Sequence, residues 1–358
     1  MHIKNKKKAN DCDVLIIGAG PAGAIAAHKL VKDGYRVIVV EQKKLPRYKI
    51  CSGLIMDRSQ DLIEEYFGAP PLNVFCSPNY LKGSRICLEG DTFENVPAGK
   101  SQTYNVWRSE FDHWLIKSSG AKVLDSNQLL DFKQEKDTVR ALILGPDKET
   151  FSIEASYLIG ADGGRSRVRG LLYPDLIKQI SRFVFMQAYC IGTTKLEREY
   201  YYMFFDPSLS ALYTWLNFKD DYIVYGVGAH SGGSLKPYFK ESSEYLAKHF
   251  DLKIDTIVRK TGCTATDMGI KNNFRLGRER VLLVGEAAGF MNLFGEGISS
   301  ALTTGKIAAK AIQEAESSEK DVLPIYSELS SSEREYTSKS WELADMILGR
   351  DFLGKGIK

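Results

Sequence analysis

Apolar runs and segments of helical periodicity alternate along the chain. Residues 14–17 form a continuous apolar run, which is typical of a parallel strand buried on both faces. An Ala-rich segment over residues 22–31 predicts a helix that ends at Gly34, and residues 35–40 predict a second strand. The same patterns predict helices over 56–67, 109–119, 241–250 and 298–312, strands over 85–96, 121–124 and 278–285, and a hairpin of 140–144 with 150–155. Ser109 and Asp112 have the spacing of a capping box at the start of the helix over 109–119.

The strand–helix–strand pieces are interrupted by β-rich sequence. Residues 183–227 are rich in Tyr, Phe and Trp and lack helical periodicity. We therefore predict an α/β protein with a discontinuous, doubly wound, Rossmann-like nucleotide-binding domain and an inserted mixed β-sheet domain. The predicted boundaries are 1–70, 100–175 and 270–320 for the first domain, 71–99 and 176–269 for the second, and 321–358 for a helical C-terminal tail.

Three glycines follow the first predicted strand in the spacing G-x-G-x-x-G. Gly18 would form the tight turn, Gly20 would let a pyrophosphate approach the backbone, and Gly23 would let helix and strand pack closely. Pro21 and Ala22 would open the helix, whose free N–H groups and positive dipole end attract phosphate. The spacing therefore predicts a dinucleotide site.

Glu41 supports this interpretation. It ends the second predicted strand 23 residues after Gly18, close to the spacing at which a carboxylate binds a ribose hydroxyl. The glycine pattern alone also occurs as an ordinary turn in α/β proteins. Two further glycine-rich signatures, GADGGRSRVR over residues 160–169 and GEAAGFMNLFGEGI over residues 285–298, make the combination much more specific.

Charge and composition narrow the classes of function. The 358 residues include 48 basic and 45 acidic ones, and this nearly balanced net charge of +3 argues against a nucleic-acid-binding protein. The basic N-terminal tail (Lys4, Lys6, Lys7 and Lys8) is either a solvated terminus or a segment weakly attracted to an anionic membrane surface. Six cysteines without C-x-x-C spacing predict neither a disulfide framework nor a metal site. With no signal-peptide-like or membrane-spanning run, we expect a cytoplasmic protein.

The three signatures, together with Arg108 at the start of a helix, resemble FAD-dependent enzymes of the p-hydroxybenzoate hydroxylase fold. Within that group, CSG at residues 51–53, ALYTWLNFKDDYIVYGVG at 211–228 and GEGI at 295–298 resemble the geranylgeranyl reductase family. GEAAGF at 285–290 resembles a bacterial branch of uncharacterised FAD-binding oxidoreductases. The resemblance extends from about residue 13 to residue 312.

The resemblance implies FAD as cofactor and suggests which residues hold it. The implied contacts are Gly18, Gly20, Pro21, Ala22, Gly23, Glu41, Gln42, Cys51, Ser52, Arg108, Asp162, Gly285, Glu286, Gly295, Gly297 and Ile298. Arg108 would contact the phosphate–ribitol region, and Glu286 would face ribitol or phosphate. The GEGI segment would place a helix N-terminus beside the isoalloxazine, where its partial positive charge stabilises anionic reduced flavin.

The sequence departs from the family at two places. Residues 291–294, MNLF, lack the proline that relatives usually carry, with Leu293 near its position, and the turn is one residue shorter. Ser52 replaces the commoner glycine. Cys51 is a candidate catalytic thiol near the flavin, or a small packing residue in a loop. Tyr213, Trp215 and Phe218 are expected to line an apolar substrate pocket.

Several functions remain open at this stage. The favoured one is an FAD-dependent oxidoreductase that reduces a carbon–carbon double bond of an apolar, isoprenoid-like small molecule by hydride transfer. The alternatives are a class A-like flavin monooxygenase, a flavin halogenase and, among non-enzymes, a flavin-binding assembly partner. The halogenase pattern W-x-W-x-I-P is absent, and no second dinucleotide fingerprint is present. The external reductant is therefore open between NAD(P)H, a ferredoxin-type donor and another reductase, and the oligomeric state is unknown.

Overall fold

The computed structural model describes residues 11–88, 91–99, 102–292 and 295–348. The basic N-terminal tail and Leu293 lie outside the described residues.

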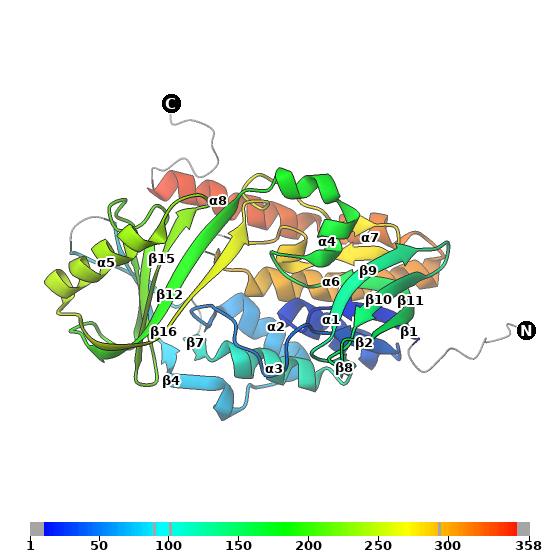
Figure 1. The fold of residues 1–358 in the computed structure, drawn as a ribbon, viewed down its shortest axis with the longest axis horizontal. Coiled ribbons are helices and arrows are strands. Elements are labelled where there is room, and N and C mark those ends of the chain that lie inside the picture. The colour runs from blue at the N-terminus through cyan, green and yellow to red at the C-terminus, as the bar shows by residue number, and fades with distance from the viewer. Residues whose placement is uncertain (1–10, 89–90, 100–101, 293–294, 349–358) are drawn as a thin grey trace, which may run out of the picture.

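One lobe is built on an eight-stranded sheet (Figure 1). Its order is β17-β18-β11-β1-β2-β8, and β10 and β9 extend it from β11. The central strands pair in parallel, as the continuous apolar runs predict. The strands of this sheet are β1 Cys12–Ile17, β2 Val37–Val40, β8 Lys122–Leu124, β9 Gln128–Gln134, β10 Val139–Leu144, β11 Thr150–Gly160, β17 Gly277–Arg278 and β18 Val281–Leu283.

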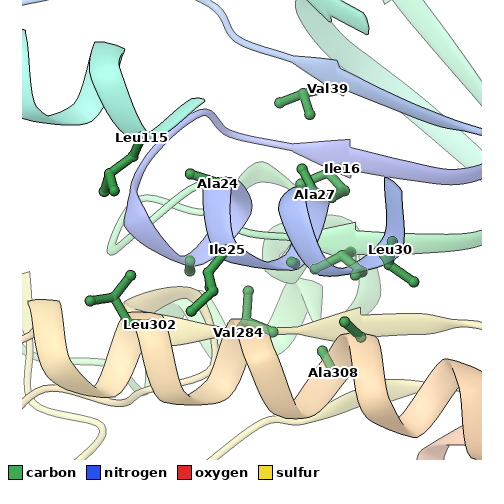
Figure 2. Packing of buried hydrophobic residues seen from close by; sticks show 14 of the residues in the cluster. Ile16, Ala24, Ile25, Ala27, Leu30, Val39, Leu115, Val284, Leu302 and Ala308 are labelled. Atoms are coloured by element: carbon green, nitrogen blue, oxygen red, sulfur yellow. The ribbon is translucent and has the colours of Figure 1, made fainter. Parts of the chain in front are cut away.

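Helices α1 (Pro21–Lys32) and α6 (Ile298–Ser318) form the core of this lobe. Figure 2 shows α1 between the strands that carry Ile16 and Val39 and helix α6, with Ile25 pointing toward Leu302. The two helices can approach closely because Gly305 has no Cβ. A Cβ at this position would collide with the carbonyl oxygen of Ala22. The other helices are α2 Asp57–Phe67, α3 Arg108–Ser118, α4 Arg167–Leu172, α7 Val322–Leu329 and α8 Ser331–Leu348, with short 3₁₀ turns η1 Leu72–Val74, η2 Pro174–Lys178 and η3 Gly285–Ala287.

The second lobe is a seven-stranded, mostly antiparallel sheet of order β16-β12-β15-β14-β13-β5-β6. Helix α5 (Leu235–Phe250) covers its outer face (Figure 1). The strands are β5 Gly83–Cys87, β6 Glu94–Pro97, β12 Arg182–Thr193, β13 Tyr200–Phe204, β14 Thr214–Lys219, β15 Tyr222–His230 and β16 Lys253–Thr266. A three-stranded sheet of β3 (Leu54–Ile55), β7 (Thr103–Val106) and β4 (Phe75–Leu81) completes the fold.

Most predicted elements agree with the structure. The hairpin is confirmed, since β10 pairs with β11 from Arg140–Glu154 to Leu144–Thr150. The single strand over residues 85–96 is wrong, because β5 and β6 are two strands that pair with each other. The predicted domain division stays a prediction: β5 and β6 join the inserted sheet, whereas β4 pairs with β7.

The capping box at Ser109 is also wrong. Trp107 is the N-cap of α3, so Arg108 and Ser109 already belong to the first helical turn. The Asp112 carboxylate binds arginine side chains instead of a backbone N–H.

All six cysteines lie in the described part of the chain, and none forms a disulfide. Within the described ranges, no group of His, Cys, Asp and Glu is arranged to hold a metal ion. No helix in those ranges is long and apolar enough to cross a membrane.

Candidate FAD site

The turn between β1 and α1 forms a backbone cradle. Gly18 has a φ of 109°, and a Cβ there would collide with the carbonyl oxygen of Ala161. A Cβ on Gly23 would collide with the carbonyl oxygen of Gly18. Gly20 is different, because the nearest atom to its Cβ position is a guanidinium nitrogen of Arg47 at 3.6 Å. The space beside Gly20 is therefore open and faces a cation, as a pyrophosphate site requires.

Glu41 binds the edge of this cradle. Its carboxylate accepts hydrogen bonds from the backbone N–H groups of Ala19 at 3.1 Å and Lys43 at 3.0 Å, and it pairs with Arg47 Nε at 3.2 Å. The Oε1 atom, which accepts from Lys43, can accept a further hydroxyl donor, which suits a ribose. Gln42, the next residue, is exposed.

Arg47 was not predicted as a site residue. It lies in an aperiodic loop, and its side chain is 12% exposed between two carboxylates, Glu41 and Asp112. Asp112 is fully buried and also accepts from Arg108 Nε at 2.8 Å and Nη2 at 3.0 Å. Burial alone would raise the pKa of Asp112, but the charges of Arg108 and Arg47 outweigh it and hold that pKa below its usual value.

The Glu41–Arg47–Asp112–Arg108 chain leads to Cys51. Burial would lower the pKa of Arg108, but Asp112 and then the nearby Cys51 thiol raise it above its ordinary value. The Cys51 Sγ also accepts a hydrogen bond from the Gly53 backbone N–H at 3.3 Å. The structure thus brings together Arg108 and Cys51, which the sequence separates by more than fifty positions.

The second glycine-rich signature meets the first at the end of β11. Asp162 lies against Gly18, and its Oδ2 accepts from the backbone N–H groups of Arg167 at 2.6 Å and Val168 at 3.1 Å. Its Oδ1 is buried and has no hydrogen-bond partner among the described residues. Burial raises the pKa of Asp162. This orphaned oxygen indicates a missing polar partner at the cradle.

The third signature packs on the second. Arg169 donates to the carbonyl oxygens of Ala287 at 2.8 Å and Glu286 at 3.2 Å, and a Cβ on Gly164 would collide with the Glu286 carboxylate. Burial raises the pKa of Glu286. Gly285 lies beside the first signature, since its Cβ position is 3.6 Å from Ala22 Cβ.

The GEGI segment forms the N-terminus of α6. Gly297 is the N-cap and Ile298 is the first helical residue. The backbone N–H of Ser299 is not free for a ligand, because it donates to Glu296 Oε1 at 2.9 Å. Gly295 has a φ of 74°, and its Cβ position is 3.8 Å from the hydroxyl of Tyr213.

Helix α8 holds the loop before α6, a role that sequence analysis missed. Thr337 donates to Asn292 Oδ1 at 2.9 Å, and Trp341 Nε1 donates to the Met291 carbonyl oxygen at 2.7 Å. Asn292 in turn donates to Glu296 at 2.8 Å and to Ser300 at 2.8 Å. In Figure 1, α8 lies along the top of the view. The predicted C-terminal tail is therefore part of the site's support.

We expect Thr337→Val to lower the free energy of unfolding by about 1–3 kcal/mol, because it removes the donor to a buried amide oxygen while keeping the side-chain shape. FAD affinity should fall as well, since Asn292 holds the GEGI segment. Denaturant unfolding and FAD titration measure the two effects. Ser338→Ala is the matched control, because its hydroxyl bonds Arg334 and Asn272 and not this loop. Equal behaviour of the two variants would contradict the support role of α8.

The inner face of the seven-stranded sheet lies against the loop of residues 51–53. The hydroxyls of Ser52 and Tyr201 are 3.3 Å apart, and Asn217 Nδ2 donates to the Ser52 carbonyl oxygen at 3.5 Å. Trp215 and Tyr213 belong to this face. Phe218 requires a correction: it points to the opposite face and packs in the core beneath α5. Strand alternation explains the difference, because residues 213, 215, 217 and 219 share one face.

Lys219 is a second residue that sequence analysis missed. It is almost fully buried, and its ammonium donates to the Val106 carbonyl oxygen at 2.7 Å and Asn105 Oδ1 at 3.0 Å, with Cys76 Sγ at 3.5 Å. Burial lowers its pKa. A Cβ on Gly53 would lie 2.7 Å from Lys219 Nζ, so this lysine braces the 51–53 loop.

These residues fit FAD. The open side of Gly20 with Arg47 suits the pyrophosphate, Glu41 suits the ribose, and the orphaned Asp162 Oδ1 provides an acceptor where the three signatures meet. Bound FAD would be held by these groups and by Arg108, with the α6 N-terminus and the 51–53 loop on the flavin side. The residue-by-residue assignment stays a prediction.

Comparison with known proteins agrees with this arrangement. A model of the FAD binding domain family matches residues 11–313. The curated protein CbrA of Escherichia coli O157:H7 is 30% identical over 303 residues, which cover 82% of each chain. A geranylgeranyl bacteriochlorophyll reductase-like protein from Thermoplasma acidophilum has a TM-score of 0.80 at 22% identity, over 96% of this chain and 89% of that one. The myxobacterial chondrochloren halogenase has a TM-score of 0.73 at 16% identity, over 94% and 82%. The fold of the p-hydroxybenzoate hydroxylase type is thereby confirmed, and the chain belongs to the FAD binding domain family of flavoproteins.

Proposed function

We propose that this flavoprotein reduces a carbon–carbon double bond of an apolar, isoprenoid-like molecule. The observation that carries the proposal is the inner face of the seven-stranded sheet. Its apolar cluster is formed by Leu81, Tyr201, Met203, Phe205 and Trp215, and it packs on Leu54, the first residue of β3, directly after the flavin-side loop of residues 51–53. Such a face binds apolar chains through burial of their surface. The fold similarity to a protein described as geranylgeranyl bacteriochlorophyll reductase-like agrees with this choice.

Bound FAD would supply a hydride at flavin N5, and the chain's own residues would orient the alkene and exclude water. The Tyr201 hydroxyl beside Ser52 would hold a proton at its oxygen. Burial raises the pKa of Tyr201 well above its ordinary value and outweighs the opposing effect of the Ser52 hydrogen bond, so this group stays protonated at neutral pH. Electrons would come from NAD(P)H or a ferredoxin-type protein.

The test is an anaerobic reaction of the chemically reduced holoenzyme. Polyprenyl-type alkenes should reoxidise the bound flavin and yield a product with one double bond fewer, whereas saturated analogues should not. In air the reduced enzyme should form mainly hydrogen peroxide. Labelled oxygen in a hydroxylated product would replace this proposal by a monooxygenase, and halide incorporation would replace it by a halogenase. Failure with every acceptor, with FAD bound, would favour the non-enzyme alternative.

Cys51→Ala should leave the FAD content unchanged, because we place the thiol on the substrate side of the 51–53 loop and its bond to the Gly53 N–H is weak. The FAD-to-protein absorbance ratio measures this, and Cys51→Ser is the conservative control. An unchanged kcat would identify Cys51 as a packing residue, and a lower kcat with FAD bound would give the thiol a part in catalysis. Loss of FAD would contradict the placement of the loop.

A further inference from the structure

Buried polar atoms without partners collect on the inner face of the seven-stranded sheet. Among the described residues, the Trp215 indole N–H, the Asn217 Oδ1 and the Gln187 Oε1 are buried without a hydrogen-bond partner. Asn217 and Gln187 are fully buried, and Trp215 is 5% exposed. Leaving a buried polar atom unpaired is unfavourable, so three on one face indicate a ligand group that pairs with them.

The sheet register places these residues on one face of neighbouring strands. Trp215 on β14 pairs with Gly226 on β15, and Gly226 pairs with Gln187 on β12, so the three positions form one row on the same face. The Trp215 ring extends over Gly226, with Cη2 2.6 Å from where a Cβ would be. Asn217 follows on the same face of β14, next to Ser52 of the flavin-side loop.

The donor and acceptor atoms of Asn217 and Trp215 determine which ligand group can pair with them. The Asn217 amide lies with Nδ2 3.5 Å from the Ser52 carbonyl oxygen, which leaves Oδ1 as an acceptor. Trp215 offers only a donor. A complementary group must therefore donate to Asn217 and accept from Trp215, as a hydroxyl does. A carboxylate or phosphate has no proton to donate, and a hydrocarbon does neither.

The nearby Lys219 ammonium does not favour an anionic ligand group over a hydroxyl. Lys219 lies on the same face two positions after Asn217, but its ammonium already bonds Val106, Asn105 and Cys76. Its three protons are thus committed, and it offers none to an anionic group.

We propose that the natural substrate is an apolar alcohol, whose hydroxyl bonds Trp215 and Asn217 with Gln187 beside them. This inference rests on the proposed function, because it assumes that the substrate occupies this face.

The experiment measures binding to oxidised holoenzyme without turnover. Geraniol, its carboxylic acid and the matching ten-carbon diene hydrocarbon are titrated separately, and the change in flavin absorbance reports binding. The alcohol should bind at least about tenfold more tightly than either analogue. Asn217→Leu and Trp215→Phe should each weaken alcohol binding about fivefold or more relative to hydrocarbon binding. Phe218→Leu, on the opposite face, is the control and should keep the preference.

Three outcomes would contradict the inference. Equal binding of the three compounds would mean that ordered water pairs with these atoms. Tighter binding of the acid would indicate an anion site, and loss of FAD in Asn217→Leu would assign the oxygen to the cofactor. If Asn217→Leu does not fold, Trp215→Phe decides alone. A bound alcohol that fails to reoxidise reduced flavin would overturn the reductase proposal and not this one.

Discussion

Gly20→Val should give a folded protein that contains no FAD. The nearest neighbour of the added side chain in the protein is Arg47, 3.6 Å from the Cβ position, so the apo fold tolerates it. The same side chain would occupy the space that a pyrophosphate needs beside the α1 N-terminus. The FAD content of the purified variant and its circular dichroism measure the two parts of the expectation.

Two variants of the same turn and helix sharpen this test. Gly23→Val should fail to fold, because its Cβ would collide with the Gly18 carbonyl oxygen. Lys32→Val, at the exposed end of α1, should keep both the fold and FAD. A yellow Gly20→Val protein with wild-type FAD content would remove the β1–α1 turn from the cofactor site.

Asp112→Asn should lower the free energy of unfolding at neutral pH by about 3–5 kcal/mol, because it leaves the buried Arg108 and Arg47 without their shared counter-charge. Denaturant unfolding of the protein saturated with FAD measures the loss. Glu244→Gln is the matched control, since it removes one partner of an exposed ion pair and should cost about 0–1 kcal/mol. Similar losses in the two variants would show that the arginine chain contributes little.

The stability difference between wild type and Asp112→Asn should depend on pH. The pKa of Asp112 is depressed in the folded protein, so its contribution to stability is fully present above the unfolded value of about 3.9. That contribution disappears as pH falls through the folded pKa. The difference in stability between wild type and Asp112→Asn should therefore narrow in acid and stay constant between neutral pH and about pH 5.

Local sequence pattern predicted the nucleotide lobe well. The continuous apolar run of β1, the glycine spacing and the alanine-rich helix are each decided within a few residues, and Gly34 ends α1 with a φ of 88°. The Phe218 assignment ignored strand alternation, which was available in the sequence. The Arg108–Asp112 pair was also visible as an i, i+4 pair of opposite charge, yet the capping-box interpretation was preferred.

Other parts of the site could not be predicted from the sequence, because they depend on contacts between segments that are distant along the chain. Arg47 lies in a loop without periodicity. Its role follows from Glu41, directly after β2, and Asp112 in α3, which both pair with it. Thr337 and Asn292 meet across 45 positions, so the support that α8 gives to the GEGI segment has no local signal. Lys219 resembles a surface residue at a strand end until the fold buries it against Val106 and Asn105.

The most direct test of the central claim is the cofactor content of the wild-type protein. The protein should purify yellow, and heat denaturation should release FAD, and not FMN, at close to one equivalent per chain, because the Glu41 and Gly20 region is built for the adenosine ribose and the pyrophosphate that FMN lacks. Colourless protein that FAD cannot reconstitute, or release of FMN alone, would contradict the account.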